Sequence, residues 1–334
     1  MQIKSLVMNI LVIGGAGFIG SHMVKFLHNK GCKVTTLDDF SSGRRNAVHY
    51  GNIVTGDFGN TNILNNILQY NFDAVFHFAS SIQVGESVNN PQKYYHNNFV
   101  NTINLLSALK NHGIMKIIFS STAAIFGNPV SIPIDENHPQ NPLSPYGRSK
   151  MMVEQVLADY DRAYGLKYVS LRYFNAAGAD PEGDLGECHQ PETHLIPLIL
   201  QAASGRIKSI NLYGSDYKTN DGTCVRDYIH VNDLCSAHWL ALESLMSGCE
   251  SQSYNLGNGI GFSVKEVIEA AERVTLRKIP VVELPRREGD PDILVADSKF
   301  AHSRLGWSAK YSDISLIINH AWNWENKLSA GYIV

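Results

Sequence analysis

Short apolar runs alternate with amphipathic stretches along the first half of the chain. The first run, residues 9–13, is largely aliphatic and is followed at once by glycines, which is typical of a buried strand. Residues 20–31 then place apolar side chains on one helical face and stop at Gly31. The same order repeats to about residue 175, which predicts an α/β fold with a parallel, doubly wound (Rossmann-type) sheet and right-handed connections.

After residue 175 the alternation ends, and a smaller mixed α/β lobe is expected. Residues 176–194 are polar and rich in glycine, proline and acidic residues, as in a long active-site loop. We therefore predict two domains, residues 1–175 and 176–334, with elements free to cross over between them. The predicted strands are 33–39, 52–57, 73–80, 116–122, 168–175, 210–214, 253–258 and 280–284, and the further predicted helices are 62–70, 94–113, 149–165, 194–205 and 263–275.

The composition favours a packed globular protein that binds small ligands. Hydrophobic residues make up 44% of the 334 residues and charged residues 18%, which excludes a disordered chain. A net charge of -3 offers no basic face for nucleic acid. The apolar run near the N-terminus is far shorter than the ~20 residues of a membrane-spanning helix, so no membrane partner is expected.

The cysteines and histidines predict reduced thiols and no metal centre. The cysteines are odd in number and widely spread, with no C-x-x-C pair, which favours a cytoplasmic location. The 13 histidines include no H-E-x-x-H motif and no zinc-site spacing with cysteine, so no metal is expected. The five cysteines are Cys32, Cys188, Cys224, Cys235 and Cys249.

The segment GGAGFIG predicts a dinucleotide site. It follows a strand and opens a helix, with Gly14, Gly17 and Gly20 where a tight turn and a close backbone approach need residues without side chains. The helix that follows offers N–H groups to a pyrophosphate. Asp38 and Asp39 end the next strand, where a carboxylate binds a ribose hydroxyl and repels a 2′-phosphate, which favours NAD over NADP. Alternatively, either aspartate could cap a helix in the segment SSGRRN without touching a ligand.

The segment SPYGRSK predicts an acid/base pair at the start of a helix. Ser144 can cap this helix and Pro145 suits its first position. Tyr146 and Lys150 then lie at i and i+4 on one face. A phenol titrates at about pH 10, but a nearby ammonium favours the phenolate and lowers that pKa, and Lys150 can also bind the nicotinamide ribose. An exposed helical pair without a function is the alternative.

Three hydroxyl residues end the strand that precedes this helix. They are expected at the carboxyl edge of the sheet, where such folds bind ligands. We predict that Thr122, rather than Ser120 or Ser121, hydrogen-bonds a substrate hydroxyl and passes its proton to Tyr146. A hydroxyl satisfied within the strand end is the alternative.

Together these motifs resemble those of the extended short-chain dehydrogenase/reductase family and, within it, the UDP-hexose 4-epimerases. The resemblance runs from about residue 8 to residue 324, and includes the segments HFAS, VGES, YYHNN, LRYFNAAGA, DGTCVRDYIHV, YNLGNG and RREGDP. It implies an enzyme that uses NAD to epimerise UDP-glucose and UDP-galactose at C4 through a 4-keto intermediate. It also implies a homodimer through helices at 97–109 and 151–164. An oxidoreductase of the same fold and a non-enzymatic NAD-binding protein are the alternatives.

The resemblance also implies roles for individual residues. Catalytic roles are implied for Tyr146, Lys150 and Thr122. Cofactor contacts are implied for Gly14, Gly17, Phe18, Ile19, Gly20, Asp38, Asp39, Phe40, Ser41, Ser42, Asp57, Phe58, Phe78, Ala79, Ser80, Asn97, Ser120, Tyr146, Lys150 and Phe174. Contacts with the UDP-sugar are implied for Thr122, Tyr146, Asn175, His194, Leu195, Asn211, Leu212, Tyr213, Arg226, Arg287 and Asp290.

Some positions depart from the family pattern. Ile82 stands where many of these epimerases have a lysine that reaches the cofactor, and His194 replaces a common asparagine. Leu294 matches a position whose bulk governs the acceptance of N-acetyl sugars, and leucine is intermediate in size. Ala123 and Ala124 stand where the related 4,6-dehydratases carry acids, so the group needed for elimination of water is missing.

Overall fold

The computed structural model of the chain describes residues 7–287 and 290–331. The chain forms two compact units, and each is built from separate stretches of sequence. The first unit comprises Met1–Ser121, Ser144–Leu171 and His238–Ser253, and the second comprises Thr122–Leu143, Arg172–Ala237 and Tyr254–Val334. The predicted division after residue 175 differs from this arrangement at residues 122–143, 172–175 and 238–253.

A seven-stranded sheet has the strand order β10-β6-β5-β4-β1-β2-β3. The pairs β1–β2, β1–β4, β2–β3 and β4–β5 are all parallel, which confirms the predicted doubly wound, Rossmann-type sheet. The order reverses between β1 and β4, and ligands bind at such a reversal in open α/β sheets. The strands are β1 (Asn9–Ile13), β2 (Lys33–Asp38), β3 (Asn52–Thr55), β4 (Ala74–His77), β5 (Lys116–Thr122), β6 (Lys167–Tyr173) and β10 (Gln252–Leu256).

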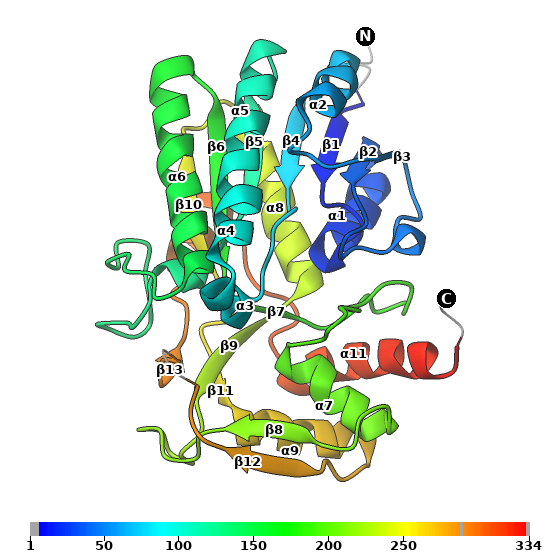
Figure 1. The fold of residues 1–334 in the computed structure, drawn as a ribbon, viewed down its shortest axis with the longest axis vertical. Coiled ribbons are helices and arrows are strands. Elements are labelled where there is room, and N and C mark those ends of the chain that lie inside the picture. The colour runs from blue at the N-terminus through cyan, green and yellow to red at the C-terminus, as the bar shows by residue number, and fades with distance from the viewer. Residues whose placement is uncertain (1–6, 288–289, 332–334) are drawn as a thin grey trace. The chain divides into compact units, whose positions relative to one another are not determined.

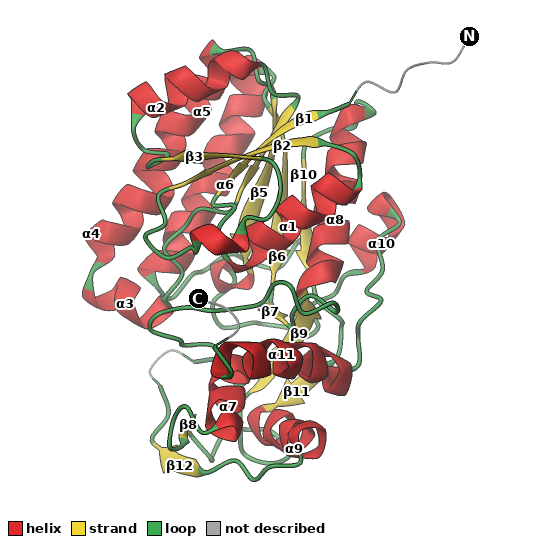
Figure 2. Ribbon diagram, turned by 90° about the vertical axis from the view of Figure 1, so that its right-hand side faces the viewer, coloured by secondary structure: helices red, strands yellow, loops and turns green. Residues whose placement is uncertain are grey.

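Helices cover both faces of this sheet (Figure 1). Figure 2 shows α2, α5 and α6 on one face, with α1 and α8 on the other. Because both faces are covered, the central strands do not alternate between apolar and polar residues. All four residues of β4 are buried. The helices are α1 (Phe18–Asn29), α2 (Thr61–Ile67), α3 (Val84–Asn89), α4 (Pro91–Tyr94), α5 (Asn101–Asn111), α6 (Pro145–Tyr164) and α8 (Val231–Met246).

The core of the first unit fixes the position of α6. Val153 and Leu157 lie four residues apart on one face of α6, and both are almost fully buried. They join a cluster of buried side chains from β1, β4, β5, α2 and α5. This packing holds the N-terminal turn of α6, which carries Tyr146, in a defined place.

The segment 94–113 is not the single continuous helix that its sequence pattern predicts. The α-helix α4 ends at Tyr94, a π-helical stretch spans Tyr95–Val100, and α5 resumes at Asn101. Stretches of π-helix are rare and often mark functional sites. Here the stretch carries Asn97 and Asn98.

The second unit has its own sheets and core. A four-stranded sheet contains β11, β9 and β13 in that order, with β7 also paired to β9, and β8 pairs with β12. Helices α7, α9 and α11 enclose a second cluster of buried apolar residues. The strands are β7 (Asn175–Ala177), β8 (Ile210–Tyr213), β9 (Val225–His230), β11 (Gly261–Ser263), β12 (Val281–Leu284) and β13 (Ile293–Leu294), and the helices are α7 (Leu195–Ser204), α9 (Val264–Thr275), α10 (Lys299–Leu305) and α11 (Ile314–Ser329).

Several elements differ from the sequence prediction. The strand predicted at 253–258 is β10, which joins the large sheet instead of the smaller lobe. Helices α3, α8, α10 and α11 and strands β11 and β13 were not predicted from the sequence. A signal for α11 was present, since Asp313 caps it by accepting a hydrogen bond from the backbone N of Ser315 at 2.8 Å. Short 3₁₀ turns are η1 (Arg45–Ala47), η2 (Leu68–Tyr70) and η4 (Ala123–Ile125). Within the described ranges, no helix combines the length and apolar character needed to cross a membrane.

Candidate active site

The glycine turn after β1 has no room for a side chain at two of its three predicted positions. Gly14 has a φ of +79°, and a Cβ there would lie 2.4 Å from the backbone N of Ala79. A Cβ at Gly20 would lie 2.1 Å from the carbonyl oxygen of Gly14. A Cβ at Gly17 would meet only that oxygen, at 3.5 Å. The turn itself therefore requires Gly14 and Gly20, whereas the space beside Gly17 is open.

The start of α1 has the features of an anion site that fits NAD. Gly17 is the N-cap, no side chain caps the helix, and the first turn, which begins with Phe18 and Ile19, holds no acidic residue. The first N–H groups of a helix have no partners within it and form the positive end of its dipole. In addition, the hydroxyl of Ser80 is buried without a hydrogen-bond partner among the described residues. The open space at Gly17 and the Ser80 hydroxyl both suit a bound dinucleotide.

Asp38 ties the glycine turn to the end of β2. Its carboxylate accepts hydrogen bonds from the backbone N–H groups of Ala16 and Phe40, both at 2.9 Å. Burial raises the pKa of Asp38, and these two hydrogen bonds oppose the rise. Asp39 accepts hydrogen bonds from the backbone N, at 2.9 Å, and the hydroxyl, at 2.7 Å, of Ser41. Neither aspartate is the N-cap of η1, so the alternative capping role is wrong for that turn.

The predicted cofactor residues of the first unit gather at one edge of the sheet. Because β1 to β5 run parallel, the residues that follow them lie along the same edge. Phe58 is buried there, with its ring 5.0 Å from that of His77, so its side chain belongs to the core. The residues at this edge are Gly14, Gly17 and Gly20 after β1, Asp38, Asp39, Phe40, Ser41 and Ser42 at β2, Asp57 and Phe58 after β3, Phe78, Ala79 and Ser80 after β4, and Ser120 in β5.

The start of α6 is built as its sequence predicts. The Ser144 hydroxyl accepts a hydrogen bond from the backbone N of Gly147 at 3.2 Å, and Pro145 occupies the first helical position. This confirms the predicted cap. Tyr146 follows in the first turn, half-buried, and its ring lies edge-on to that of Tyr94 at 6.5 Å.

Lys150 lies one turn further along α6 and is almost fully buried. Its ammonium donates a hydrogen bond to the carbonyl oxygen of Ser120 at 2.7 Å and lies 4.8 Å from the centre of the Phe119 ring. Burial lowers the pKa of Lys150 to about 7, and the nearby Glu154 carboxylate opposes the shift. Glu154 in turn accepts a hydrogen bond from the Ser121 hydroxyl. The strand end and the helix are therefore joined through backbone and side-chain contacts.

Thr122 and Phe174 belong to the second unit, so their approach to Tyr146 and to the cofactor stays a prediction. The Thr122 hydroxyl accepts a hydrogen bond from the backbone N of Ala124 at 3.1 Å. This is the structural role that the alternative interpretation gives it. The oxygen retains its own proton and a second lone pair for a further partner.

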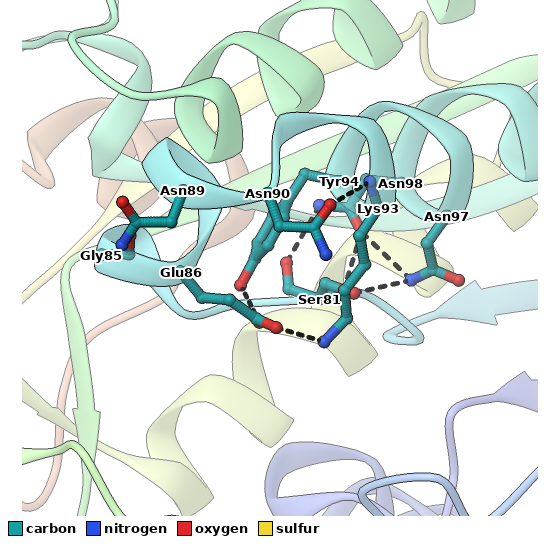
Figure 3. Close-up of polar contacts among 9 residues, drawn as sticks. All are labelled: Ser81, Gly85, Glu86, Asn89, Asn90, Lys93, Tyr94, Asn97 and Asn98. Atoms are coloured by element: carbon teal, nitrogen blue, oxygen red, sulfur yellow. Dashed lines mark hydrogen bonds and ion pairs between the residues drawn. The ribbon is translucent and has the colours of Figure 1, made fainter.

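A buried asparagine, Asn98, connects the loop after β4 to α6, and Figure 3 shows its contacts with Ser81 of that loop. The Asn98 side chain accepts a hydrogen bond from the backbone N of Ser81 at 2.8 Å and donates one to its carbonyl oxygen at 2.9 Å. Asn98 also donates to the Ser149 hydroxyl at 3.1 Å, and Ser149 donates to the carbonyl oxygen of Tyr146 at 2.7 Å. Asn97, a predicted cofactor residue, donates to the Ser81 hydroxyl at 3.3 Å. The backbone of Tyr146 is thus linked to the loop that also carries the predicted cofactor residues 78–80.

A second set of contacts fixes the aromatic neighbour of Tyr146. Tyr94 is fully buried, and its hydroxyl donates a hydrogen bond to Glu86 at 2.8 Å. Glu86 also accepts a hydrogen bond from Lys93 at 2.7 Å (Figure 3). Sequence reasoning assigned no role to Glu86, Tyr94, Asn98 or Ser149. The only signal was that all four lie within segments that carry the family resemblance, namely VGES, YYHNN and SPYGRSK.

In the second unit, Arg226 on β9 is held by Asp290. One guanidinium nitrogen of Arg226 contacts the Asp290 carboxylate, and another donates to the carbonyl oxygen of Val225 at 2.7 Å. The backbone N of Asp290 donates to the carbonyl oxygen of Arg287 at 3.4 Å. Both arginines predicted to hold the diphosphate are therefore linked through Asp290.

Other predicted substrate residues form a group around Tyr213. The guanidinium of Arg287 lies 3.8 Å from the centre of the Tyr213 ring, and Asn211 donates to the Tyr213 hydroxyl at 3.3 Å. Asn211 and Arg287 hold the pKa of Tyr213 below its usual range. Leu212 is 3% exposed, so its side chain belongs to the core. Asn175 is tied to the backbone of β9 by a hydrogen bond of 2.9 Å.

The last two predicted substrate residues lie at the start of α7. His194 is the N-cap residue and Leu195 the first residue of the helix. The His194 ring contacts the carboxylate of Glu187, and no capping hydrogen bond from the His194 side chain is present. The His194 side chain therefore has a partner within its own loop.

The fold and the glycine turn define a dinucleotide-binding protein of the α/β class, and comparison with known proteins makes the class specific. The family model described as "NAD dependent epimerase/dehydratase family" matches residues 10–257. The chain is 49% identical over 326 residues to a UDP-glucose 4-epimerase of Halalkalibacterium halodurans, covering 97% of this chain and 98% of that one. It is 51% identical over 319 residues to a UDP-glucose 4-epimerase of Rhizobium leguminosarum bv. trifolii, covering 95% and 97%.

Solved structures agree with this result. The UDP-glucose 4-epimerase of Brucella ovis in complex with NAD matches with a TM-score of 0.93 and 48% identity, covering 95% of this chain and 98% of that one. The UDP-glucose 4-epimerase of Bifidobacterium longum in complex with NAD+ and UDP matches with a TM-score of 0.91 and 38% identity, covering 96% and 98%. The chain belongs to the NAD dependent epimerase/dehydratase family.

Replacing Gly17 with alanine tests where the pyrophosphate binds. The added Cβ meets only one protein atom, at 3.5 Å, so thermal stability should be close to that of the wild type. It would occupy the space beside the first N–H groups of α1, so we expect NAD affinity to fall by about tenfold or more, a loss of ~1.4 kcal/mol. Isothermal titration with NAD measures the loss. Gly85→Ala is the control, because nothing lies within 4 Å of its Cβ and its φ is not positive. Unchanged NAD affinity in Gly17→Ala would place the pyrophosphate elsewhere.

Proposed function

We propose that this chain interconverts UDP-glucose and UDP-galactose by NAD-dependent epimerisation at C4. Its similarity to UDP-glucose 4-epimerases extends over nearly its whole length. The observation that carries the proposal is the start of α6, where a capped first turn presents the half-buried Tyr146 and the next turn presents the buried Lys150. A phenol and an amine so placed suit proton transfer to and from a sugar hydroxyl.

The chemistry divides between the cofactor and the chain. NAD, held by the glycine turn and the start of α1, would supply a hydride acceptor and donor for C4 of the sugar. Tyr146, as a phenolate, takes the proton of the 4-hydroxyl, directly or by way of Thr122, and gives it back when the 4-keto group is reduced. When Lys150 is protonated, its positive charge favours the phenolate form of Tyr146. Ala123 and Ala124 follow Thr122 in η4, and neither can serve as an acid for elimination of water.

A C4 epimerase must hold the nucleotide firmly while the 4-keto sugar rotates about its bond to the diphosphate. We propose that residues of the second unit bind the nucleotide. Arg226 and Arg287 suit a diphosphate, because a planar guanidinium pairs with two phosphate oxygens. The Asp290 carboxylate positions the guanidinium of Arg226, and the Arg287 guanidinium lies over the Tyr213 ring. The other residues proposed to contact the UDP-sugar are Asn175, His194, Leu195, Asn211, Leu212 and Tyr213.

The size of the sugar pocket is proposed to depend on Leu294. Leu294 lies on β13, half-buried, and its backbone is in register with that of Arg226 on β9. A residue of intermediate bulk beside a proposed diphosphate ligand leaves room for UDP-N-acetylglucosamine as a second substrate. That sugar nucleotide is therefore included in the test below.

An equilibration assay tests the proposed function. The purified chain is incubated with UDP-galactose, with and without added NAD, and the products are separated. We expect UDP-glucose to form until equilibrium is reached, with no net absorbance from NADH. Accumulation of NADH would instead indicate an oxidoreductase. No conversion of UDP-galactose or UDP-glucose in the presence of NAD would contradict the proposal, and a parallel incubation with UDP-N-acetylglucosamine tests the role of Leu294.

We further propose that the enzyme is a cytoplasmic homodimer. None of the five cysteines forms a disulfide, which suits a reducing compartment. The dimer is proposed to form through α5 and α6, which pack against one another. Val100, just before α5, and Tyr164, at the end of α6, are both exposed. Light scattering on the full chain tests this state, and a mass of one 37.0 kDa chain would contradict it.

A further inference from the structure

Four potential metal ligands lie close together in the loop between β7 and α7. They are Glu187, His189, Glu192 and His194, all within eight residues of sequence. One ligand atom from each lies within 4.8 Å of all the others. Nδ1 of His189 is 3.0 Å from a carboxylate oxygen of Glu187, and Nδ1 of His194 contacts the same oxygen. The donor atoms thus converge on one point.

The two carboxylates are buried and are held in place by groups outside the histidines. Both the Glu187 and the Glu192 side chains are 4% exposed. One Glu192 oxygen accepts backbone hydrogen bonds from Thr193 at 2.7 Å and His194 at 2.9 Å. The carbonyl oxygen of Glu187 accepts a hydrogen bond from the indole of Trp324 at 2.9 Å. The backbone of the loop is therefore anchored to α11 at Glu187.

The neighbouring backbone strengthens this anchoring. A Cβ at Gly186 would lie 2.2 Å from Cγ of Trp324, so the loop lies directly against the indole ring. Further along the loop, Lys327 donates a hydrogen bond to the carbonyl oxygen of Gly183 at 2.7 Å. The residues that lead into the four ligands are thus held against α11.

We propose that Glu187, His189, Glu192 and His194 bind one divalent transition-metal ion, Zn²⁺ in the first instance. Two imidazole nitrogens and two carboxylate oxygens form a set that Zn²⁺ accepts with tetrahedral geometry. The cation would neutralise two buried carboxylates that otherwise repel one another. This proposal revises the sequence-based expectation of no metal. That expectation arose because the spacing E-x-H-x-x-E-x-H matches no familiar zinc pattern.

The competing occupant of the site is a pair of protons. Burial alone would raise the pKa of Glu187, but His194 and His189 outweigh it and lower the pKa to about 2. Burial opposes a charge on His189, but hydrogen bonds to Glu187 and Glu192 raise its pKa to about 10. If His189 and His194 were both protonated, their two positive charges would also neutralise the carboxylates. The experiment must therefore distinguish a bound metal from these protons.

A bound metal would attach the loop between β7 and α7 more firmly to the start of α7. His194 is the N-cap residue of α7, and a bond from its Nδ1 to a metal held by Glu187 would pin the start of that helix. Leu195 follows directly. The metal is therefore assigned a structural role, and its loss should loosen the segment that leads into α7.

Metal analysis of the full chain tests the proposal. The chain is purified without a polyhistidine tag or chelator, and bound metals are measured by mass spectrometry. The protein is then stripped with a chelator and titrated with Zn²⁺. We expect about one Zn²⁺ per chain. In Glu187→Gln and His189→Gln the affinity should fall by more than about 100-fold, because outer-shell partners alone account for 10–100-fold. His112→Gln, whose ring contacts Asn65 in the first unit, should bind like the wild type.

Thermal unfolding and the spectrum of bound Co²⁺ are two further measurements that distinguish a bound metal from protons. In the wild type, added Zn²⁺ should raise the thermal unfolding temperature, and Co²⁺ should give the visible spectrum of a four-coordinate site with nitrogen and oxygen ligands. Failure of the stripped wild-type chain to bind Zn²⁺ in the titration would overturn the proposal, and the cluster would then be an ion-pair network held by protons. Because the wild-type titration is decisive by itself, a variant that fails to fold does not weaken the test.

Discussion

Replacing Tyr146 with phenylalanine is expected to lower kcat for UDP-galactose by about 10²–10⁴-fold, the range for loss of a general acid/base. The ring of Tyr146 packs edge-on against that of Tyr94, and phenylalanine keeps this contact. The hydrogen bond from Ser149 goes to the backbone of residue 146 and is also kept. The variant should therefore fold and bind NAD as the wild type does. Steady-state kinetics and NAD titration measure the two effects separately.

Tyr164→Phe is the matched control for this experiment. Tyr164 is the last residue of α6, and 51% of its surface is exposed. Removing its hydroxyl changes the same helix by the same atom, so kcat should not change. If Tyr146→Phe kept its full rate of epimerisation, the proton would have to be taken by another group, and the proposed role of α6 would be wrong.

Replacing Lys150 with methionine is expected to lower activity by about 100-fold or more while leaving the protein at least as stable as the wild type. Lys150 is almost fully buried, and burial lowers its pKa from 10.5 to about 7. An unfolded chain therefore binds the Lys150 proton more tightly than the folded chain does. Methionine fills a similar volume without a charge. Activity assays and chemical denaturation of the full chain give the two results.

The stability difference between Lys150→Met and the wild type should depend on pH. Because the folded-state pKa of Lys150 lies below its unfolded value, the unfolded state holds an extra proton between pH 7 and 10.5. Over that window the wild type gains stability as pH rises, by about 1.4 kcal/mol per pH unit. The advantage of Lys150→Met should be largest at and below about pH 7 and shrink above it.

Lys208→Met is the control, since Lys208 is exposed and its removal should change neither activity nor the pH dependence of stability. A Lys150→Met variant that unfolded at a much lower denaturant concentration than the wild type at pH 7 would show that the hydrogen bond from Lys150 to Ser120 outweighs the burial of its charge. Full activity in the variant would contradict the catalytic role.

Features that depend on neighbours in sequence could be predicted from the sequence. The cap at Ser144 with Pro145 in the first helical position involves residues no more than three apart. The glycine turn is equally local, since Gly14 and Gly20 pack against one another. The buried parallel strands follow from short apolar runs, such as that of β4. In these cases the chemistry of a few adjacent residues decides the local structure.

Contacts between residues distant in sequence could not be predicted in the same way. Asn98 and Ser149 are 51 residues apart, and Ser121 and Glu154 are 33 apart. No periodicity or spacing links such pairs, because they meet only after the π-helical stretch and α6 have packed beside the sheet. The loop from Glu187 to His194 is a different case: its ligands are close in sequence, but their convergence depends on the anchoring of the loop to α11.

The sequence by itself determined the class of sheet, the dinucleotide turn and the helix that presents Tyr146, because each follows from backbone geometry and side-chain chemistry over a few residues. Only the tertiary structure decided that Lys150 is buried beneath the end of β5, that Asn98 ties Tyr146 to the loop after β4, and that two glutamates and two histidines meet in one place. The physical reason is that burial and long-range hydrogen bonds depend on which elements pack together, and that choice is made by the whole core.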